Sequence, residues 1–187
     1  MPLTFSKTWD QALVAVVVRE AAKAEECYLS TVALKKILYF LQIAGVPMRY
    51  NFDLYHYGPH CDRVFHDLEM LLADGVLKDT SMRSAMHANY RLGPGAVALI
   101  ETHALALAPH LKTIDTVIQA IRPIDLLHLE IITTLDYLYR YLKAGGGHGP
   151  WKDRVLKRFQ EVKKDKFAAE EASDAYDSMA RAGLVEL

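Results

Sequence analysis

Four side chains that could bind a metal ion lie in one short stretch of the sequence: His56, His60, Cys61 and His66. Zinc sites in proteins are built from histidine and cysteine ligands. The spacing matches no familiar zinc motif, and the side chains of the neighbours His60 and Cys61 diverge from each other. We therefore predict no metal site, and we interpret His56 as a strand residue and His60 as part of a helix-cap region.

The glycine-rich stretch 145–149 is a second candidate for chemistry, because it precedes a predicted helix. Exposed backbone N–H groups ahead of a helix can bind an anion. This stretch lacks the lysine and the Ser/Thr of a phosphate-binding loop, so we interpret it as a flexible connector. No Gly-x-Ser-x-Gly motif is present, and no Cys/His pair has a visible orienting partner. The sequence predicts a protein that is not an enzyme and that carries no cofactor.

The overall composition is that of an ordinary globular protein. Of the 187 residues, 51% are hydrophobic and 24% are charged, and the formal net charge is −1. This balance gives no global attraction to nucleic acid or to an anionic membrane. We recognise no signal peptide and no apolar run that could span a bilayer, so we expect a soluble cytoplasmic protein with reduced cysteines.

A pattern that occurs twice indicates the fold. Residues 67–77 and 174–185 each read as the end of an amphipathic helix, a glycine stop and an apolar strand start. Winged-helix modules end in this way, and glycine supplies the left-handed residue that closes the helix. The expected fold is mainly α with small β hairpins. It comprises a winged-helix-like unit over 1–95, one or two bridging helices over 96–122, and a C-terminal helical, degenerate winged-helix-like unit over 123–187.

Apolar periodicity and turn signals locate the individual elements. Helices are predicted over 9–24, 31–44, 59–74, 96–121 with an interruption at Pro109, 124–142, 151–164 and 168–182. We expect Thr8 and Gln11 to form a capping box at the first helix, and Pro59 to start the third. A strand is predicted over 50–57, a hairpin (the wing) over 76–92, and a strand-like tail over 184–187.

Three blocks of the sequence, residues 34–42, 52–60 and 68–77, resemble a known family. They are similar to the uncharacterised YwgA-like family of prokaryotes and, more distantly, to the Panacea antitoxin domain. Segments 134–138 and 163–167 also look similar to the C-terminal half of YwgA-like proteins. The first resemblance implies no activity, whereas the second implies that a toxin is neutralised by direct protein contact. Cys61 departs from the pattern, which usually has a serine helix cap there, and no functional residue is carried over.

Winged helices often bind DNA, but the charges of the two candidate recognition helices argue against that function here. The helix over 59–74 carries four carboxylates and one arginine, and the helix over 167–182 has the same ratio. A helix in the major groove faces phosphates and needs lysine or arginine beside its base-reading residues. We therefore expect DNA to repel both helices.

The favoured hypothesis is a non-enzymatic regulatory or adaptor protein, antitoxin-like or adaptor-like, that acts by contact with another protein. A toxin or a protease component is the expected kind of partner. Aromatic and arginine side chains dominate binding hot spots. The expected partner-binding residues are Tyr55, Tyr57, Lys157 and Arg158.

The alternative hypothesis is a DNA-binding winged-helix transcriptional regulator. Its expected contacts to the DNA backbone are Lys78, Arg83, Arg91, Lys152 and Arg154. The basic helix over 151–164 also has a simpler interpretation, as a solvated face paired with the acidic helix that follows it. Finally, the Ala/Leu-rich bridge could pair two copies of the chain, with Leu105 in the interface.

Overall fold

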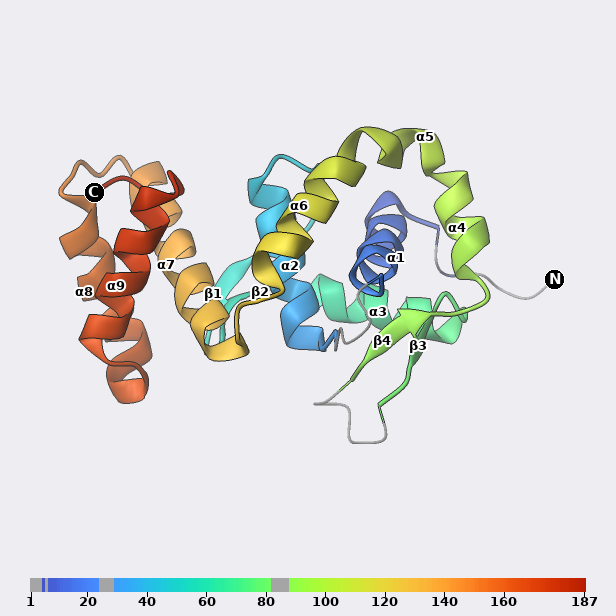
Figure 1. Cartoon of the computed structure of the whole chain (residues 1–187), viewed down its shortest axis with the longest axis horizontal. Coiled ribbons are helices and arrows are strands. Elements are labelled where there is room, and N and C mark those ends of the chain that lie inside the picture. The colour runs from blue at the N-terminus through green and yellow to red at the C-terminus, as the bar shows by residue number, and fades with distance from the viewer. Residues whose placement is uncertain (1–4, 6, 24–28, 82–87) are drawn as a thin grey trace. The chain divides into compact units, whose positions relative to one another are not determined.

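The computed structural model describes residues 5, 7–23, 29–81 and 88–187. As predicted, the chain is mainly helical with small β hairpins; the described residues form two of them, both antiparallel (Figure 1). It divides into two compact units. Unit 1 comprises Met1–Phe52 and Cys61–Ile124, and unit 2 comprises Asp53–His60 and Asp125–Leu187. The predicted bridging segment 96–122 therefore lies within unit 1. The short segment Asp53–His60, which belongs to the predicted winged-helix-like unit, lies in unit 2.

Unit 1 is built around one buried helix. Its elements are α1 (Trp9–Ala21), α2 (Thr31–Ile43), α3 (Asp62–Ala73), β3 (Leu77–Asp79), β4 (Tyr90–Leu92), α4 (Ala96–Thr102), α5 (Ala104–Leu107), the 3₁₀ turn η2 (Ala108–His110) and α6 (Leu111–Ile121). Helix α1 contacts α2, α3, α4, α6 and β4, and Figure 1 shows it nearly end-on among them. Its residues from Ala12 to Val18 are fully buried, as expected for a helix that is apolar on all sides.

The start of α1 is as predicted. Gln11 N donates to Thr8 Oγ1 at 3.3 Å and Thr8 N donates to Gln11 Oε1 at 3.0 Å, which completes the capping box. The β-branched run from Val16 to Val18 disfavours a helix in isolation. Burial of all three side chains compensates for this weakness, because tertiary packing supplies most of the stability of a helix in a protein.

A polar cluster joins α1 to α3 inside unit 1. The hydroxyl of Tyr50 donates to Asp67 Oδ2 at 3.0 Å, and Gln11 Nε2 donates to Asp67 Oδ1 at 3.1 Å. Arg63 forms an ion pair with Asp10 at 3.3 Å. Asp67, counted above among the carboxylates of a candidate recognition helix, is thus a buried structural residue.

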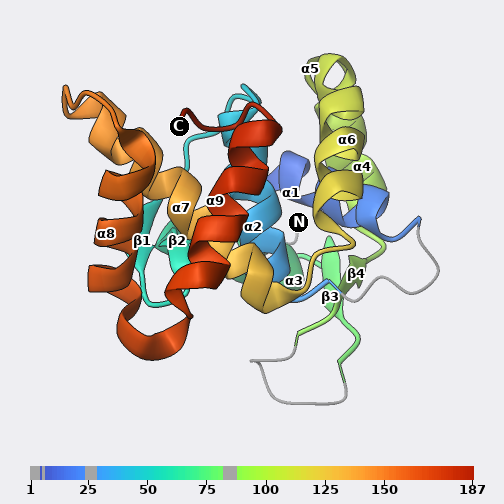
Figure 2. The ribbon, with the colours of Figure 1, turned by 60° about the vertical axis from the view of Figure 1, so that its left-hand side comes forward.

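Unit 2 packs three helices and one hairpin around its own core. Its elements are β1 (Asp53–Tyr55), β2 (Gly58–His60), α7 (Leu126–Ala144), α8 (Trp151–Lys163), the 3₁₀ turn η3 (Lys164–Lys166) and α9 (Ala169–Arg181). Phe159 and Tyr176 are fully buried in this core, and Leu54 of β1 packs against it. The views in Figures 1 and 2 agree that the β1–β2 hairpin lies beside α7, which it contacts through β2.

Several predicted element boundaries are wrong. Pro59 does not start a helix: it lies in β2 opposite Leu54, and α3 begins at Asp62. Proline is tolerated there because the sheet has only two strands and both are edges. Helix α7 is capped by Asp125, whose Oδ1 accepts the N–H groups of Leu127 and His128, both at 2.9 Å.

The strand predicted over 50–57 shortens to Asp53–Tyr55, and no strand forms in the fully described tail 184–187. Part of the predicted wing loop, residues 82–87, lies outside the described residues.

Candidate functional site

The β3–β4 hairpin of unit 1 has one buried face and one polar face. Leu77 and Tyr90 are buried, whereas Lys78 and Arg91 lie directly opposite each other on the two strands. Successive side chains of a strand point to opposite faces of the sheet, and directly opposed residues share a face. The polar face therefore carries Lys78, Arg91 and, two residues along each strand, Thr80 and Asn89.

A pocket with a volume of about 510 Å³ lies between this polar face and the end of α1. Its lining residues are Arg19, Ala22, Lys23, Lys78, Thr80, Asn89, Arg91 and Leu92. We call it the basic pocket, because half of these residues are lysine or arginine. Arg19 lies in the last turn of α1, and Lys23 lies in the turn directly after this helix.

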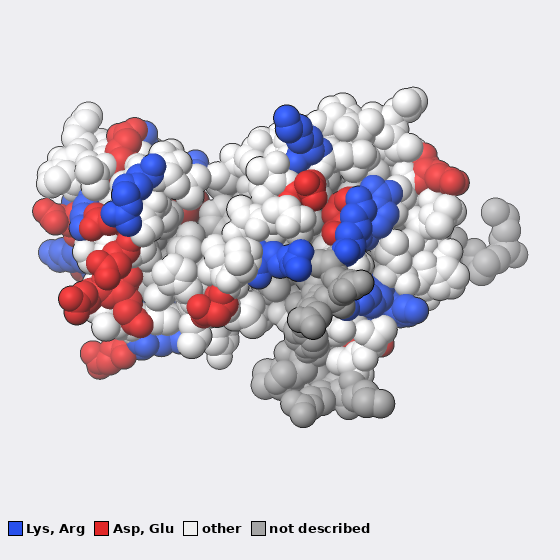
Figure 3. Space-filling view, in the orientation of Figure 1, with Lys and Arg blue, Asp and Glu red and all other residues white. Residues whose placement is uncertain are grey.

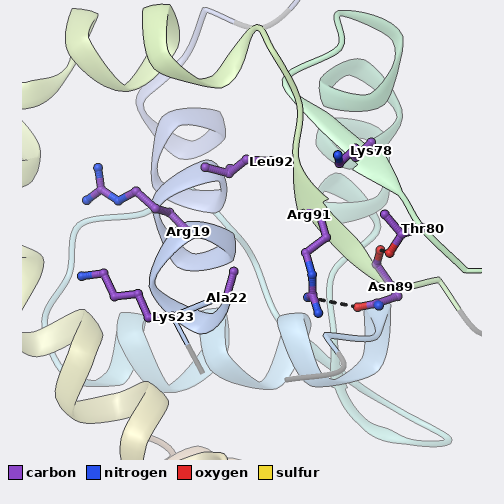
Figure 4. A pocket seen from close by; sticks show the side chains of 8 residues that line it. All are labelled: Arg19, Ala22, Lys23, Lys78, Thr80, Asn89, Arg91 and Leu92. Atoms are coloured by element: carbon purple, nitrogen blue, oxygen red, sulfur yellow. Dashed lines mark hydrogen bonds between the residues drawn. The ribbon is translucent and has the colours of Figure 1, made fainter. Parts of the chain in front are cut away.

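The four cations of the basic pocket come from two sides of it. In Figure 4, Arg19 and Lys23 extend from the end of α1 and the turn after it, Arg91 lies between α1 and the hairpin, and Lys78 lies on the more distant strand, β3. They do not converge on one point. The pocket is therefore suited to a ligand with several separated negative charges rather than to one compact anion.

Glu20 binds the two cations on the α1 side of the pocket. Its Oε1 accepts a hydrogen bond from Arg19 Nε at 2.9 Å, and its Oε2 forms an ion pair with Lys23 Nζ. Burial alone would raise the pKa of Glu20, but the hydrogen bonds and charges of Lys23 and Arg19 outweigh it, and the pKa lies below its usual value. Glu20 is therefore ionised at neutral pH.

Hydrogen bonds fix the hairpin side of the pocket. Arg91 Nη1 donates to Asn89 Oδ1 at 3.2 Å, and the same oxygen accepts the backbone N–H of Leu29 at 3.2 Å. Asp79 Oδ1 accepts the backbone N–H groups of Ser81 and Asn89, both at 2.8 Å. Lys78 is exposed and forms no ion pair with any residue that the structure describes.

Two of the predicted DNA-contact residues, Lys78 and Arg91, meet in this pocket, and Arg83 lies outside the described residues. Sequence reasoning missed Arg19 and Lys23. The available signal was a pair of basic residues four apart, at the end of a largely apolar helix and in the turn after it, but only the position of the hairpin makes that pair part of a site.

The other predicted basic residues lie on α8 of unit 2. Three of them bind neighbours within that unit. Lys152 forms an ion pair with Asp177 of α9 at 2.7 Å, and Arg158 forms one with Glu161 at 2.7 Å. Arg154 donates a hydrogen bond to the carbonyl of His148 at 2.6 Å. Lys157 is exposed and has no ion pair within the described ranges. The Lys152–Asp177 pair agrees with the interpretation of α8 as a solvated face paired with the acidic helix that follows.

The predicted partner-binding tyrosines lie on the β1–β2 hairpin of unit 2. Tyr55 is exposed, and its ring centroid lies 4.7 Å from that of His56 and 5.4 Å from that of His60. Tyr57 is also exposed, with the ammonium of Lys166 4.6 Å from its ring centroid. One face of Tyr57 is thus covered by a lysine of the chain itself.

The described residues contain no group of three or more His, Cys, Asp or Glu side chains that could hold a metal ion. His56 and His60 belong to unit 2, whereas Cys61 and His66 belong to unit 1, where Cys61 precedes α3 without a side-chain cap bond.

On the face drawn in Figure 3, Asp and Glu gather over α8 and α9, whereas Lys and Arg lie interspersed with Asp and Glu over unit 1. None of the helices in the described ranges combines the length and the apolar composition that a membrane span requires. No protein-family model matches the chain, and no curated protein matches it.

Proposed function

We propose that this chain is a non-enzymatic regulatory or adaptor protein of the cytoplasm that acts by binding another protein. The basic pocket of unit 1 is the docking surface, and the partner presents an acidic surface to it. The observation that carries the proposal is the set of four cations that line one pocket, contributed by the end of α1 with its following turn and by the β3–β4 hairpin of unit 1. The distant resemblance to the Panacea domain, which implies protein contact, supports the same class of function.

Protein rather than DNA is the favoured partner because of α3, the helix that a winged-helix protein would insert into the major groove. Its exposed residues include Asp62 and Glu69, and its single arginine, Arg63, is engaged by the buried carboxylate of Asp10. Such a surface repels phosphates. None of the described residues that line the basic pocket is aromatic, so the pocket offers no platform on which a base could stack.

A DNA-binding regulator remains the second candidate, and one observation favours it. Lys78 and Arg91 share the polar face of a hairpin that stands where a wing is expected. In that version the hairpin contacts the DNA backbone and α3 stays outside the groove. Phosphate contacts of this kind position a protein on DNA but read no sequence.

A pair of binding measurements tests the proposal. Affinity capture from the source cell compares the wild type with the double variant Lys78→Glu/Arg91→Glu and with a control, Lys112→Glu, which reverses an exposed charge on α6. We expect wild type and control to recover the same acidic partner and the double variant to lose it. In parallel, a random DNA duplex is titrated at about 50 mM salt, where phosphate contacts are strong.

Duplex binding that weakens steeply with added salt, together with capture that the double variant does not change, would reject protein contact in favour of the DNA-binding candidate. The slope of the logarithm of affinity against the logarithm of salt would then approximate the number of phosphates that the protein neutralises.

A further inference from the structure

We infer that Tyr137 and Tyr141 of α7, together with Asp53 of β1, form a binding site for an arginine side chain of a partner protein. All three residues belong to unit 2, and none of them lines the basic pocket. The site goes beyond the proposed function, because it is a second contact with the opposite charge preference. Either site can exist without the other.

The two tyrosine rings lie nearly parallel on one side of α7. Tyr137 and Tyr141 are four residues apart, so their side chains are neighbours on the helix surface. Their ring centroids are 6.4 Å apart, and their planes differ by only 10°. A flat group that lies parallel to one ring therefore lies parallel to the other as well. One cation can also lie within about 6 Å of both centroids, which is the range of a cation–π contact.

Neither ring is covered by a cation of the chain itself. Several other aromatic rings do have a lysine or arginine over them, namely Tyr57, Phe65, Tyr139 and Trp151. None of the described lysines and arginines lies over Tyr137 or Tyr141 in this way, although Tyr141 is 64% exposed. The pair therefore presents aromatic surface that this part of the chain leaves to solvent.

Asp53 supplies a negative charge beside the tyrosine pair. Burial raises the pKa of Tyr137, the charge of Asp53 raises it further, and a hydrogen bond with the backbone of Leu54 opposes the shift. Leu54 also packs against the core of unit 2, so the hairpin fixes the position of Asp53 relative to α7. Asp53 is exposed and forms no ion pair within the ranges that the structure describes.

Arginine is the side chain whose chemistry matches this arrangement. Its guanidinium is planar, stacks on aromatic faces and binds a carboxylate through a fork of N–H groups. A guanidinium that lies parallel to the rings keeps its N–H groups at its edge, where they can donate to Asp53. The ammonium of lysine is compact and strongly hydrated, so it gains less from the rings. A quaternary ammonium binds aromatic rings but has no N–H group to donate to the carboxylate.

The probe for the test is the peptide acetyl-Gly-Gly-Arg-Gly-Gly-amide. Three matched peptides replace the arginine by citrulline, its neutral analogue of nearly the same shape, by lysine, or by trimethyllysine. The full chain, isotopically labelled for NMR, is titrated with each peptide at about 50 mM salt, where charge pairs are weakly screened. The backbone amide shifts of Asp53, Tyr137 and Tyr141 report binding at the site.

Wild type is compared with four variants. Tyr141→Leu removes a ring at an exposed position but keeps an apolar side chain, and Asp53→Asn removes the charge but keeps the shape. Phe65→Leu is the control for the loss of a ring, because the ammonium of Lys35 already lies 3.2 Å from the centroid of Phe65. Asp165→Asn is the control for the loss of a charge, at an exposed position of η3.

We expect the arginine peptide to shift the three amides in a saturable way and the citrulline peptide to leave them unchanged. Tyr141→Leu and Asp53→Asn should each weaken binding about two- to fivefold, the value of one exposed cation–π contact or charge pair. Both control variants should match wild type. The lysine and trimethyllysine peptides should bind more weakly than the arginine peptide. Unchanged amide shifts elsewhere in the free variants verify that the fold is intact.

The contrary outcomes are distinct. Equal binding of the citrulline and arginine peptides would overturn recognition of the charge. Tighter binding of the trimethyllysine peptide would overturn arginine as the ligand and Asp53 as its partner. Full affinity in both Tyr141→Leu and Asp53→Asn, or no shift of the three amides, would mean that this site does not exist. The proposed function is tested apart from it, since Lys78→Glu/Arg91→Glu should bind the arginine peptide as wild type does.

Discussion

Lys163 and Glu130 form an ion pair inside unit 2, with Nζ and Oε1 2.8 Å apart and side chains only 2% and 6% exposed. Lys163 Nζ also donates to the carbonyl of His56 at 2.7 Å, and Lys166 Nζ binds the same carboxylate at 2.8 Å. The pair therefore attaches the turn of the β1–β2 hairpin to α7 and α8. Burial lowers the pKa of Lys163, and the bond to Glu130 opposes that shift.

We predict that Glu130→Leu lowers the free energy of unfolding by about 3 to 5 kcal/mol, because it leaves the ammonium of Lys163 buried without a carboxylate. The double variant Glu130→Leu/Lys163→Met should recover much of this loss, since it removes the uncompensated charge as well. Urea denaturation followed by circular dichroism measures both values.

Lys157→Met is the matched control, because it removes a lysine from an exposed position of α8. Its effect should stay within about 0.5 kcal/mol. A loss of less than about 1 kcal/mol for Glu130→Leu would mean that the pair does not hold the hairpin in place.

Gly93 closes the base of the β3–β4 hairpin, where two backbones come very close. A Cβ atom at position 93 would lie 2.2 Å from the carbonyl oxygen of Gly75, so the backbone itself would have to move. We predict that Gly93→Ala lowers the free energy of unfolding by about 2 to 3 kcal/mol, as overpacking does. Thermal unfolding of the full chain gives the measurement. The shifted hairpin should also weaken ligand binding in the basic pocket.

Gly145→Ala is the control for Gly93→Ala. A Cβ atom at position 145 would meet ordinary contacts at 3.6 Å, and the φ angle of −74° suits any residue. This substitution should be neutral or stabilise by up to about 1 kcal/mol. Equal effects of the two substitutions would show that the close approach at Gly93 has no energetic consequence.

Leu105 is 93% exposed on α5, and a large apolar side chain in that position makes almost no contact within the chain. We predict that Leu105→Glu leaves the free energy of unfolding within about 0.5 kcal/mol of wild type. If two copies pair through this helix, the wild type sediments as a dimer and Leu105→Glu as a monomer, because the charge would be buried without a partner. Sedimentation velocity decides, and dimerisation of the variant at the wild-type affinity would rule out this interface.

Much of the local structure could be predicted from the sequence. The capping box of Thr8 and Gln11 depends on residues three apart, and the core face of α2 on a period that can be counted. The mixture of many helices with two small hairpins follows from such signals. These signals depend on residues close together in the sequence, so they do not depend on how distant parts of the chain pack.

The parts that could not be predicted depend on contacts between distant residues. The segment Asp53–His60 belongs to unit 2 because its Leu54 packs against that core, and Lys163, more than a hundred residues later, binds its turn. Asp67 has the position of a surface charge in the periodic pattern of its own helix. That pattern gives no sign of its hydrogen bonds to Tyr50 and Gln11, which lie elsewhere in the sequence. The sequence did not predict the part of Arg19 in the basic pocket for the same reason. Arg19 becomes part of a pocket only when the hairpin packs beside α1.

The carboxyl group of Asp67 provides the last prediction, which concerns pH. Burial raises the pKa of Asp67 above its usual range, although the bonds from Tyr50 and Gln11 and the charge of Arg63 oppose the shift. The folded state thus holds this proton more tightly than the unfolded state does. The resulting contribution to stability is fully present below the ordinary pKa of an unfolded aspartate and is lost as the pH rises through the folded pKa.

Asp67→Asn removes this titration but keeps a side chain of the same size that can still accept from Gln11. The stability of the variant relative to wild type should therefore increase as the pH rises from about 3 to about 7. Urea denaturation at a series of pH values gives the difference curve, and Glu69→Gln, at an exposed position of the same helix, controls for the loss of a negative charge. A difference curve for Asp67→Asn that is flat or that falls with pH would mean that the buried carboxylate is stabilised in its charged form. The hydrogen bonds of Tyr50 and Gln11 would then outweigh the cost of burying it.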